Sequence, residues 1–185
     1  MKLQKDLLYN KIKYLLYFFY DKNFIYLYCK LKRKMNNMEK KILYFDMDNV
    51  LVDFKSGIDV LNESIKNKYV GKLDEVPHIF SYMKPIDGAI DAFKKLSEKY
   101  DCYILSTAPW NNPTAASDKF AWVKKYLGDY GYKRLILSHH KNLNKGDYLI
   151  DDRPTKCGVD KFEGEVIIFG SNEYPDWESV LRYLM

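Results

Sequence analysis

From residue 41 onward, short apolar segments alternate with longer segments in which apolar residues recur every three or four positions. Short runs rich in β-branched and aromatic side chains are typical of strands in a buried sheet. The sequence therefore predicts five strands, at Lys41–Asp46, Asp101–Ser106, Arg134–Ser138, Tyr148–Asp151 and Glu165–Phe169.

Helices are predicted between these strands, where the apolar residues follow helical spacing. The stripes are Ile90/Phe93/Leu96, Phe120/Val123/Leu127 and Trp177/Val180/Leu181/Leu184. We expect Ser117 to cap the second helix and Gly128 to end it, and Asp176 to open the last. Alternating strands and helices predict an α/β fold, with a Rossmann-like parallel sheet sandwiched by helices.

One segment breaks this alternation. Residues 55–83 begin with a helical stripe (Ile58, Leu61, Ile65, Tyr69) and end in the aromatic-rich "PHIFSYM". The segment follows the first strand, where a loop opens the carboxyl edge of the sheet, and ligands bind at that edge in open parallel sheets. We therefore expect a small helical cap, inserted after the first strand of a core made of residues 39–54 and 84–185.

The first 38 residues differ from the rest in composition. Residues 1–41 carry 11 Lys/Arg and 3 Asp/Glu, a net charge of +8, so the remaining 144 residues carry 19 basic and 22 acidic residues, a net of −3. The positive charge of the chain is therefore no evidence for nucleic-acid binding by the core. The apolar runs are too short for a transmembrane helix, and no cleavage site for a signal peptide follows.

Two interpretations of residues 1–38 remain. A basic amphipathic helix on a membrane surface is one. The other, which we favour, is an appended segment outside the fold, translated from upstream of a start at Met38.

The overall composition and the cysteines indicate the class of protein and its cellular compartment. The chain has 185 residues, 47% of them hydrophobic and 30% charged, as expected for one globular domain with an insertion. Its three cysteines, Cys29, Cys102 and Cys157, lie far apart, which favours a reducing, cytoplasmic location over a disulfide framework. His139 and His140 are adjacent, a spacing that does not predict a zinc site.

Polar residues follow four of the predicted strands. They occur in "DMDNV" (46–50), "LSTAPW" (105–110), "SHHKNLNK" (138–145) and "LIDDRP" (149–154). In a parallel sheet all four segments meet at one edge, which gathers four carboxylates, a hydroxyl and a lysine. Clustered carboxylates with few histidines form an oxygen-ligand site that suits Mg²⁺. A lysine and a hydroxyl beside the metal are suited to a phosphoryl group.

These motifs, in this order, resemble the haloacid dehalogenase superfamily of Asp-based phosphatases. "DMDNVLVDF", "STAPW", "KFAWVKKYLG" and "DYLIDDRP" are most similar to the 5′(3′)-deoxyribonucleotidase family, over about residues 42–184. The resemblance implies a Mg²⁺-dependent hydrolase acting on a nucleoside monophosphate through an aspartyl-phosphate. It also implies a small-molecule partner, and leaves a homodimer open.

The resemblance also implies roles for single residues. Asp46 would be the nucleophile and Asp48 the general acid and base. Mg²⁺ would be held by Asp46, the backbone carbonyl of Asp48, and Asp152, with Asp151 orienting the cluster. Thr107 and Lys141 would bind the phosphate, with Lys145 as the competing lysine, and Phe54 would pack against the base. Lys119 is either a second cation near the phosphate or a surface lysine.

Two departures from the family pattern bear on the substrate. Ala108 stands where the family usually has a second hydroxyl, and the 55–83 insertion is shorter than the lid of the animal enzymes. Trp110, Phe80 and Tyr82 could stack on a base, but packing in the core or cap is the favoured interpretation.

Two other functions compete with a nucleotidase. A phosphatase for a sugar phosphate or another small monoester would use the same chemistry. A non-catalytic receiver-like phosphoacceptor also uses Asp, Thr and Lys with Mg²⁺, but it orders them differently along the chain and lacks an acid two residues beyond its acceptor. Asp48 therefore favours turnover.

Overall fold

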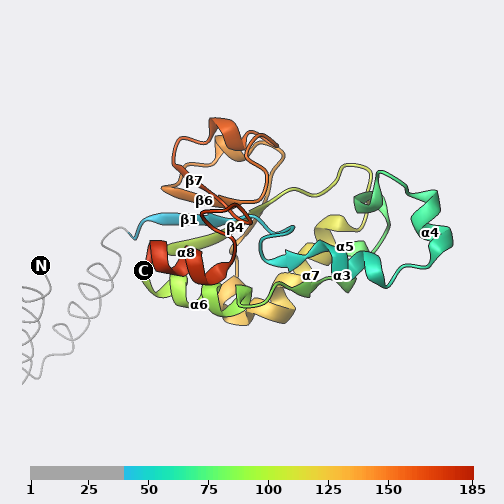
Figure 1. Cartoon of the computed structure of the whole chain (residues 1–185), viewed down its shortest axis with the longest axis horizontal. Helices are drawn as coiled ribbons and strands as arrows, with labels where there is room; N and C mark the ends of the chain where they lie inside the picture. The colour runs from blue at the N-terminus through green and yellow to red at the C-terminus, as the bar shows by residue number, and fades with distance from the viewer. Residues whose placement is uncertain (1–39) are drawn as a thin grey trace, which may run out of the picture. The chain divides into compact units, whose positions relative to one another are not determined.

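The computed structural model describes residues 40–185, of which residues 41–185 form one compact unit. Our predictions for residues 1–38 lie outside the described residues. The unit is built on a parallel sheet in the order β5-β4-β1-β6-β7. Four of these strands, β4, β1, β6 and β7, are labelled in Figure 1. The strands are β1 (Ile42–Phe45), β4 (Asp101–Ser106), β5 (Leu135–Leu137), β6 (Tyr148–Asp151) and β7 (Glu165–Ile168). All five predicted strands are thus confirmed, and with them the α/β fold.

Three helices cover one face of the sheet: α6 (Ala89–Lys99), α7 (Ala115–Leu127) and α8 (Trp177–Leu184), which bury a large apolar core against β1 and β4. Leu43 and Phe45 of β1 point into this core, as the two-residue period of a strand requires. Asp176 caps α8 by accepting a hydrogen bond from the Ser179 amide, as predicted.

The second face carries a thinner layer than a helical sandwich would give. Tyr44, Leu105 and Leu149 form a smaller apolar cluster there with Val159 and Phe162. Two 3₁₀ turns, η3 (Lys141–Leu143) and η4 (Val159–Lys161), lie in the segments that follow β5 and β6. This layer matters for function because η3 carries Lys141.

Helix α7 differs from its prediction in two respects. It begins at Ala115, with Thr114 at the N-cap position, so Ser117 lies inside the helix and donates its hydroxyl to the Thr114 carbonyl. Phe120 is 56% exposed, whereas Lys119 is fully buried. Val123 and Leu127 of the predicted stripe are buried, as expected, but Phe120 was wrong because Lys119 occupies the buried face of the helix beside it.

The segment between β1 and α6 folds as a small, mainly helical unit. It contains α3 (Phe54–Asp59), α4 (Glu63–Lys68), η1 (Leu73–Glu75) and α5 (Ile79–Tyr82). The predicted stripe is split between α3 and α4, because Asn62 caps α4 by accepting a hydrogen bond from the Ile65 amide. Gly57 permits close packing of α3 on α5, since a Cβ there would lie 3.0 Å from the Ile79 carbonyl oxygen.

A two-stranded antiparallel ribbon joins this unit to the sheet and was not predicted. Strands β2 (Val52–Asp53) and β3 (Lys84–Pro85) pair where the chain leaves and re-enters the core. The remaining short element is η2 (Gly128–Gly131), directly after α7. Among residues 40–185, no helix is long and apolar enough to cross a bilayer.

Candidate active site

The carboxyl ends of β1, β4 and β6 meet at the point where the strand order reverses. Asp46 directly follows β1, Thr107 follows β4, and Asp151 ends β6 with Asp152 next to it. The Asp46 amide donates to the Ile150 carbonyl at 2.8 Å, which fixes the first loop beside β6. Ligands bind at such a switch point because the loops on its two sides diverge.

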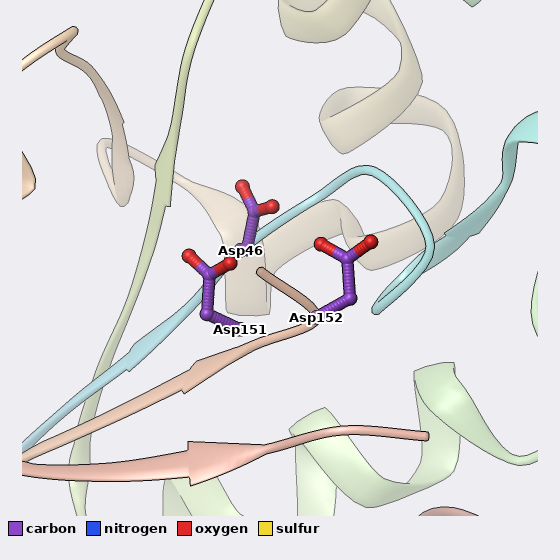
Figure 2. A group of neighbouring side chains, drawn as sticks. All are labelled: Asp46, Asp151 and Asp152. Atoms are coloured by element: carbon purple, nitrogen blue, oxygen red, sulfur yellow. The ribbon is translucent and has the colours of Figure 1, made fainter. Parts of the chain in front are cut away.

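Three carboxylates gather here, those of Asp46, Asp151 and Asp152 (Figure 2). One oxygen from each lies within 4.8 Å of the others. Asp46 Oδ2 and Asp152 Oδ1 are buried and accept no hydrogen bond. Buried carboxylate oxygens without a partner are costly, so this arrangement fits a divalent cation with oxygen ligands.

Lys141 supplies a positive charge to the same cluster. It is 1% exposed, and its Nζ lies 2.9 Å from Asp46 Oδ1 and donates a short hydrogen bond to Asp151 Oδ2. Its backbone amide donates to the Cys157 carbonyl at 2.8 Å, which anchors η3 over the sheet edge. Lys145, the competing candidate, has an exposed side chain.

Burial governs the ionisation of this cluster. It raises the pKa of Asp151 to about 6, with a further increase from Asp46 and an opposing effect of Lys141. Burial also raises the pKa of Asp152, while the hydrogen bond from Asn49 lowers it. For Lys141, burial opposes the charge, but Asp46 and Asp151 outweigh it and raise the lysine pKa.

Asp48 lies outside the three-carboxylate cluster. Residues 47–52 form a tight turn in which the Leu51 and Val52 amides donate to the Met47 carbonyl. Met47 is buried in the core, so it points away from the site. Both oxygens of Asp48 accept hydrogen bonds from Lys119 Nζ, at 2.8 and 2.7 Å. Burial raises the pKa of Asp48, and Lys119 opposes this shift.

The structure excludes the surface-lysine interpretation of Lys119, whose side chain is fully buried. Besides Asp48, its Nζ donates to Ser106 Oγ at 2.9 Å and lies 4.5 Å from the ring centre of Phe80.

Sequence reasoning missed two further residues. Asn49 donates from its side-chain amide to Asp152 Oδ2 at 3.1 Å, and its backbone lies in the left-handed region with φ of 56°. Arg153 Nε lies 3.5 Å from Asp152 Oδ1, and its backbone amide donates to Asp151 Oδ1 at 2.9 Å. Asn in a left-handed turn directly after "DMD" is a signal that could have singled out Asn49.

A pocket of about 240 Å³ opens beside Asp48. The core contributes Thr107 and Arg153 to its wall, and the helical unit contributes Phe54 together with Leu73 and Asp74. The polar side chains of Thr107 and Arg153 thus lie at the sheet edge, whereas the helical unit supplies the apolar Phe54 and Leu73 together with one carboxylate, Asp74. This suits a ligand with a charged end and a flat apolar end.

The aromatic candidates have different environments. Phe80 is fully buried and packs against Phe54, with ring centres 6.0 Å apart. Trp110 is 89% exposed, so core packing was wrong for it, and Tyr82 is 49% exposed. Ala108 packs against the core and offers no hydroxyl.

A comparison with models of known protein families covers most of the described residues. The model of the family described as 5′ nucleotidase, deoxy (pyrimidine), cytosolic type C protein matches residues 66–183.

Relatives extend over most of the chain. A protein of Vibrio phage KVP40 assigned to the 5′(3′)-deoxyribonucleotidases is 57% identical over 162 residues, which are 88% of this chain and 95% of the relative. A 5′(3′)-deoxyribonucleotidase of Bacillus subtilis is 29% identical over 79% of this chain and 99% of its own. The human cytosolic-type 5′(3′)-deoxyribonucleotidase is 27% identical over 74% of this chain and 76% of its own.

The fold is also found in a solved structure. The magnesium-bound crystal structure of the HAD-hydrolase YfnB from Bacillus subtilis has a TM-score of 0.53 and is 13% identical. The alignment covers 79% of this chain and 99% of that one. The likeness confirms the predicted haloacid dehalogenase-like fold.

Proposed function

Since the chain belongs to the 5′(3′)-deoxyribonucleotidase family of haloacid dehalogenase-like phosphatases, we propose that it hydrolyses nucleoside monophosphates to nucleosides and phosphate. The family match supports a phosphoric monoester hydrolase, and the geometry supports this chemistry in this chain.

One observation carries the proposal. Asp46 Oδ2 and Asp152 Oδ1 are buried without hydrogen-bond partners, next to the ammonium of Lys141 and beside the pocket. This is a combination of an oxygen-ligand cation site, a nucleophilic carboxylate and a fixed positive charge. It matches the needs of phosphoryl transfer, in which positioning and charge neutralisation dominate.

In the first step, Asp46 is the nucleophile. One of its oxygens forms a bond to phosphorus, and the bond from phosphorus to the nucleoside oxygen breaks with its electron pair on that oxygen. Asp48 donates its proton to the leaving oxygen, so that a neutral nucleoside departs and Asp48 becomes a carboxylate. Burial favours the protonated form of Asp48 that this step requires.

In the second step, Asp48 is the base. It takes a proton from a water molecule that attacks phosphorus on the aspartyl-phosphate of Asp46. The bond from phosphorus to the Asp46 oxygen breaks, which releases inorganic phosphate and restores both side chains.

We propose that Mg²⁺ occupies the carboxylate cluster, held by Asp46, Asp152 and the backbone carbonyl of Asp48. A bound Mg²⁺ would offset the charge of the phosphate beside these carboxylates. Asp151 accepts from Lys141 and from the Arg153 amide, so it serves to orient the cluster.

Thr107 and Lys141 are proposed to bind the phosphate oxygens, and Phe54 to pack against the base. We propose that residues 55–83 act as a cap on the core of residues 39–54 and 84–185, because Leu73 and Asp74 line the pocket together with Thr107. A cytoplasmic location is part of the proposal and agrees with the name of the human relative.

The test is initial phosphate release from dUMP, dTMP, dGMP, UMP and glucose 6-phosphate, with and without Mg²⁺. We expect Mg²⁺-dependent release with a preference for the nucleotides. Equal rates on all five substrates would replace the nucleotidase by a phosphatase for small monoesters. The Asp48→Asn variant should lose turnover while it retains phosphate binding, and full activity of this variant would overturn the acid–base assignment.

A further inference from the structure

Lys119 is a buried charge whose role the mechanism above leaves open. It lies on α7, 0% exposed, and reaches the site through the apolar layer between that helix and the sheet. A buried ion pair stabilises a fold little compared with apolar residues of similar volume. A lysine in this position therefore calls for an explanation beyond stability.

The hydrogen bonds of Lys119 leave no donor for a substrate. An ammonium group has three N–H donors, and Lys119 Nζ has three acceptors: Asp48 Oδ1, Asp48 Oδ2 and Ser106 Oγ. The Phe80 ring lies close to the same ammonium group, with its centre 4.5 Å from Nζ. Direct phosphate binding would require it to give up one of these partners.

The ion pair with Lys119 holds Asp48 from its buried side. Lys119 is fully buried, whereas the Asp48 side chain is 14% exposed and lines the pocket. Each carboxylate oxygen accepts one hydrogen bond from Lys119, which holds the plane of the carboxylate and leaves its other lone pairs free. A proton carrier must be held in hydrogen-bond reach of the reacting oxygen.

We propose that Lys119 is a positioning residue that acts through Asp48, and that it does not bind the phosphate. The inference rests on the proposed function. In this proposal a residue of α7 positions the proton carrier, although α7 lies outside the loop that carries Asp46 and Asp48. Ser106 shares this role because it accepts the third hydrogen bond and so fixes the lysine.

The primary test is the Lys119→Met variant, which removes the charge and keeps the side-chain volume. With a nucleoside monophosphate we expect kcat to fall about 100-fold, the low end for loss of a positioned acid–base group. KM and the inhibition constant of inorganic phosphate should stay within about threefold, because the phosphate contacts are untouched. A rise in both constants with kcat unchanged would identify Lys119 as a phosphate ligand and overturn the inference.

Two comparisons separate positioning from a structural role. Lys124→Met makes the same change on the exposed face of α7 and should leave all three constants unchanged. In the Asp48→Asn background, Lys119→Met should cause no further loss, since residues that act as one unit are not additive. Full additivity in the double variant would contradict the proposal. The double variant also retains no unpaired buried charge, which protects its folding.

The leaving group offers an independent measurement. Loss of kcat/KM in Lys119→Met should be at least tenfold larger for phenyl phosphate than for 4-nitrophenyl phosphate, whose phenolate departs without a proton. Equal losses on both esters would indicate a structural effect. If the unaltered protein hydrolyses no phosphomonoester, the proposed function fails; if it does and Lys119→Met is unimpaired, only this inference fails.

Discussion

Asn49 holds Asp152 in place by donating its side-chain amide to Asp152 Oδ2 at 3.1 Å. The other oxygen of Asp152, Oδ1, accepts no hydrogen bond and lies 3.5 Å from Arg153 Nε, so the Asn49 amide is the side-chain hydrogen-bond donor that fixes this carboxylate. Removing such an outer partner of a metal ligand typically weakens metal affinity about 10- to 100-fold. We expect Asn49→Gly to raise the Mg²⁺ concentration for half-maximal phosphate release by a factor in this range.

Glycine is the suitable replacement because residue 49 has a φ of 56°, which glycine adopts without strain. Asn49→Ala serves as the comparison and should add a loss of thermal stability to the same metal defect. A Mg²⁺ dependence that is unchanged in Asn49→Gly would show that Asp152 needs no support from Asn49.

Lys141 is the only lysine that the structure, within residues 40–185, places against Asp46. Lys141→Met should reduce kcat/KM about 100- to 1,000-fold, because a preorganised charge next to the phosphate is lost. It should also destabilise the metal-free protein by about 3–5 kcal/mol, because Asp46 and Asp151 lose their buried counter-ion. Steady-state kinetics and thermal unfolding measure these two effects.

Lys145→Met is the matched control for this variant. Its side chain is exposed, so we expect activity and stability close to those of the unaltered protein. Mg²⁺ should restore much of the stability of Lys141→Met by supplying positive charge to the same carboxylates. Loss of activity in Lys145→Met with an active Lys141→Met would reverse the assignment of the phosphate-binding lysine.

The carboxylate cluster predicts how the stability of the metal-free protein depends on pH. The folded-state pKa of Asp151 is about 6, above the ordinary value of 3.8, so the folded state binds more protons than the unfolded state between these values. Stability then falls as pH rises from 3.8 to about 6. Mg²⁺ requires the ionised cluster, so its stabilising effect should be larger at pH 7 than at pH 5.

Unfolding temperatures measured with and without Mg²⁺ across this range test the prediction. Asp151→Asn should make the metal-free stability less dependent on pH between 4 and 6, because its side chain does not titrate. A Mg²⁺-induced shift in unfolding temperature that is equal at pH 5 and pH 7 would contradict the proposed linkage.

Much of the site could be predicted because the period of the hydrophobic pattern locates the strand ends. Once β1, β4 and β6 are parallel neighbours, Asp46, Thr107 and Asp151 must lie at one edge. Lys141 was a predicted candidate, and its position against Asp46 depends on η3, which Cys157 anchors from a distant loop. Such a contact has no local pattern in the sequence.

The environments of other residues could not be predicted, because they too depend on contacts that leave no local pattern in the sequence. Lys119 lies three and four residues before the buried Trp122 and Val123 and so shares their face of the helix, but its charge predicts exposure to solvent. Its burial depends on the pairing with Asp48. The ribbon of β2 and β3 consists of two residues a side, too short for an alternating pattern. Trp110 is apolar and yet 89% exposed, so hydrophobicity gave it the wrong environment.

The last prediction concerns the hydrogen bonds that attach the cap, residues 55–83, to the core. Asn112, 5% exposed in the loop after β4, donates both amide hydrogens to the carbonyls of Asp74 and Val76, at 2.8 and 2.9 Å. Asn112→Ala should cost about 1–3 kcal/mol of stability, since two acceptors lose their donor. Because Leu73 and Asp74 line the pocket, the KM for a nucleoside monophosphate should rise about tenfold, roughly 1.4 kcal/mol of binding.

Inorganic phosphate provides the internal comparison for this variant. Its proposed contacts come from Thr107 and Lys141 of the core, so its inhibition constant should not change in Asn112→Ala. Asn111→Ala is the matched control. Within residues 40–185 the side chain of Asn111 donates to Glu75 Oε1 of the same cap, but this contact is exposed, so its loss should leave KM nearly unchanged. Equal weakening of nucleotide and phosphate binding would mean that Asn112 supports the core site, and that residues 55–83 do not select the nucleoside.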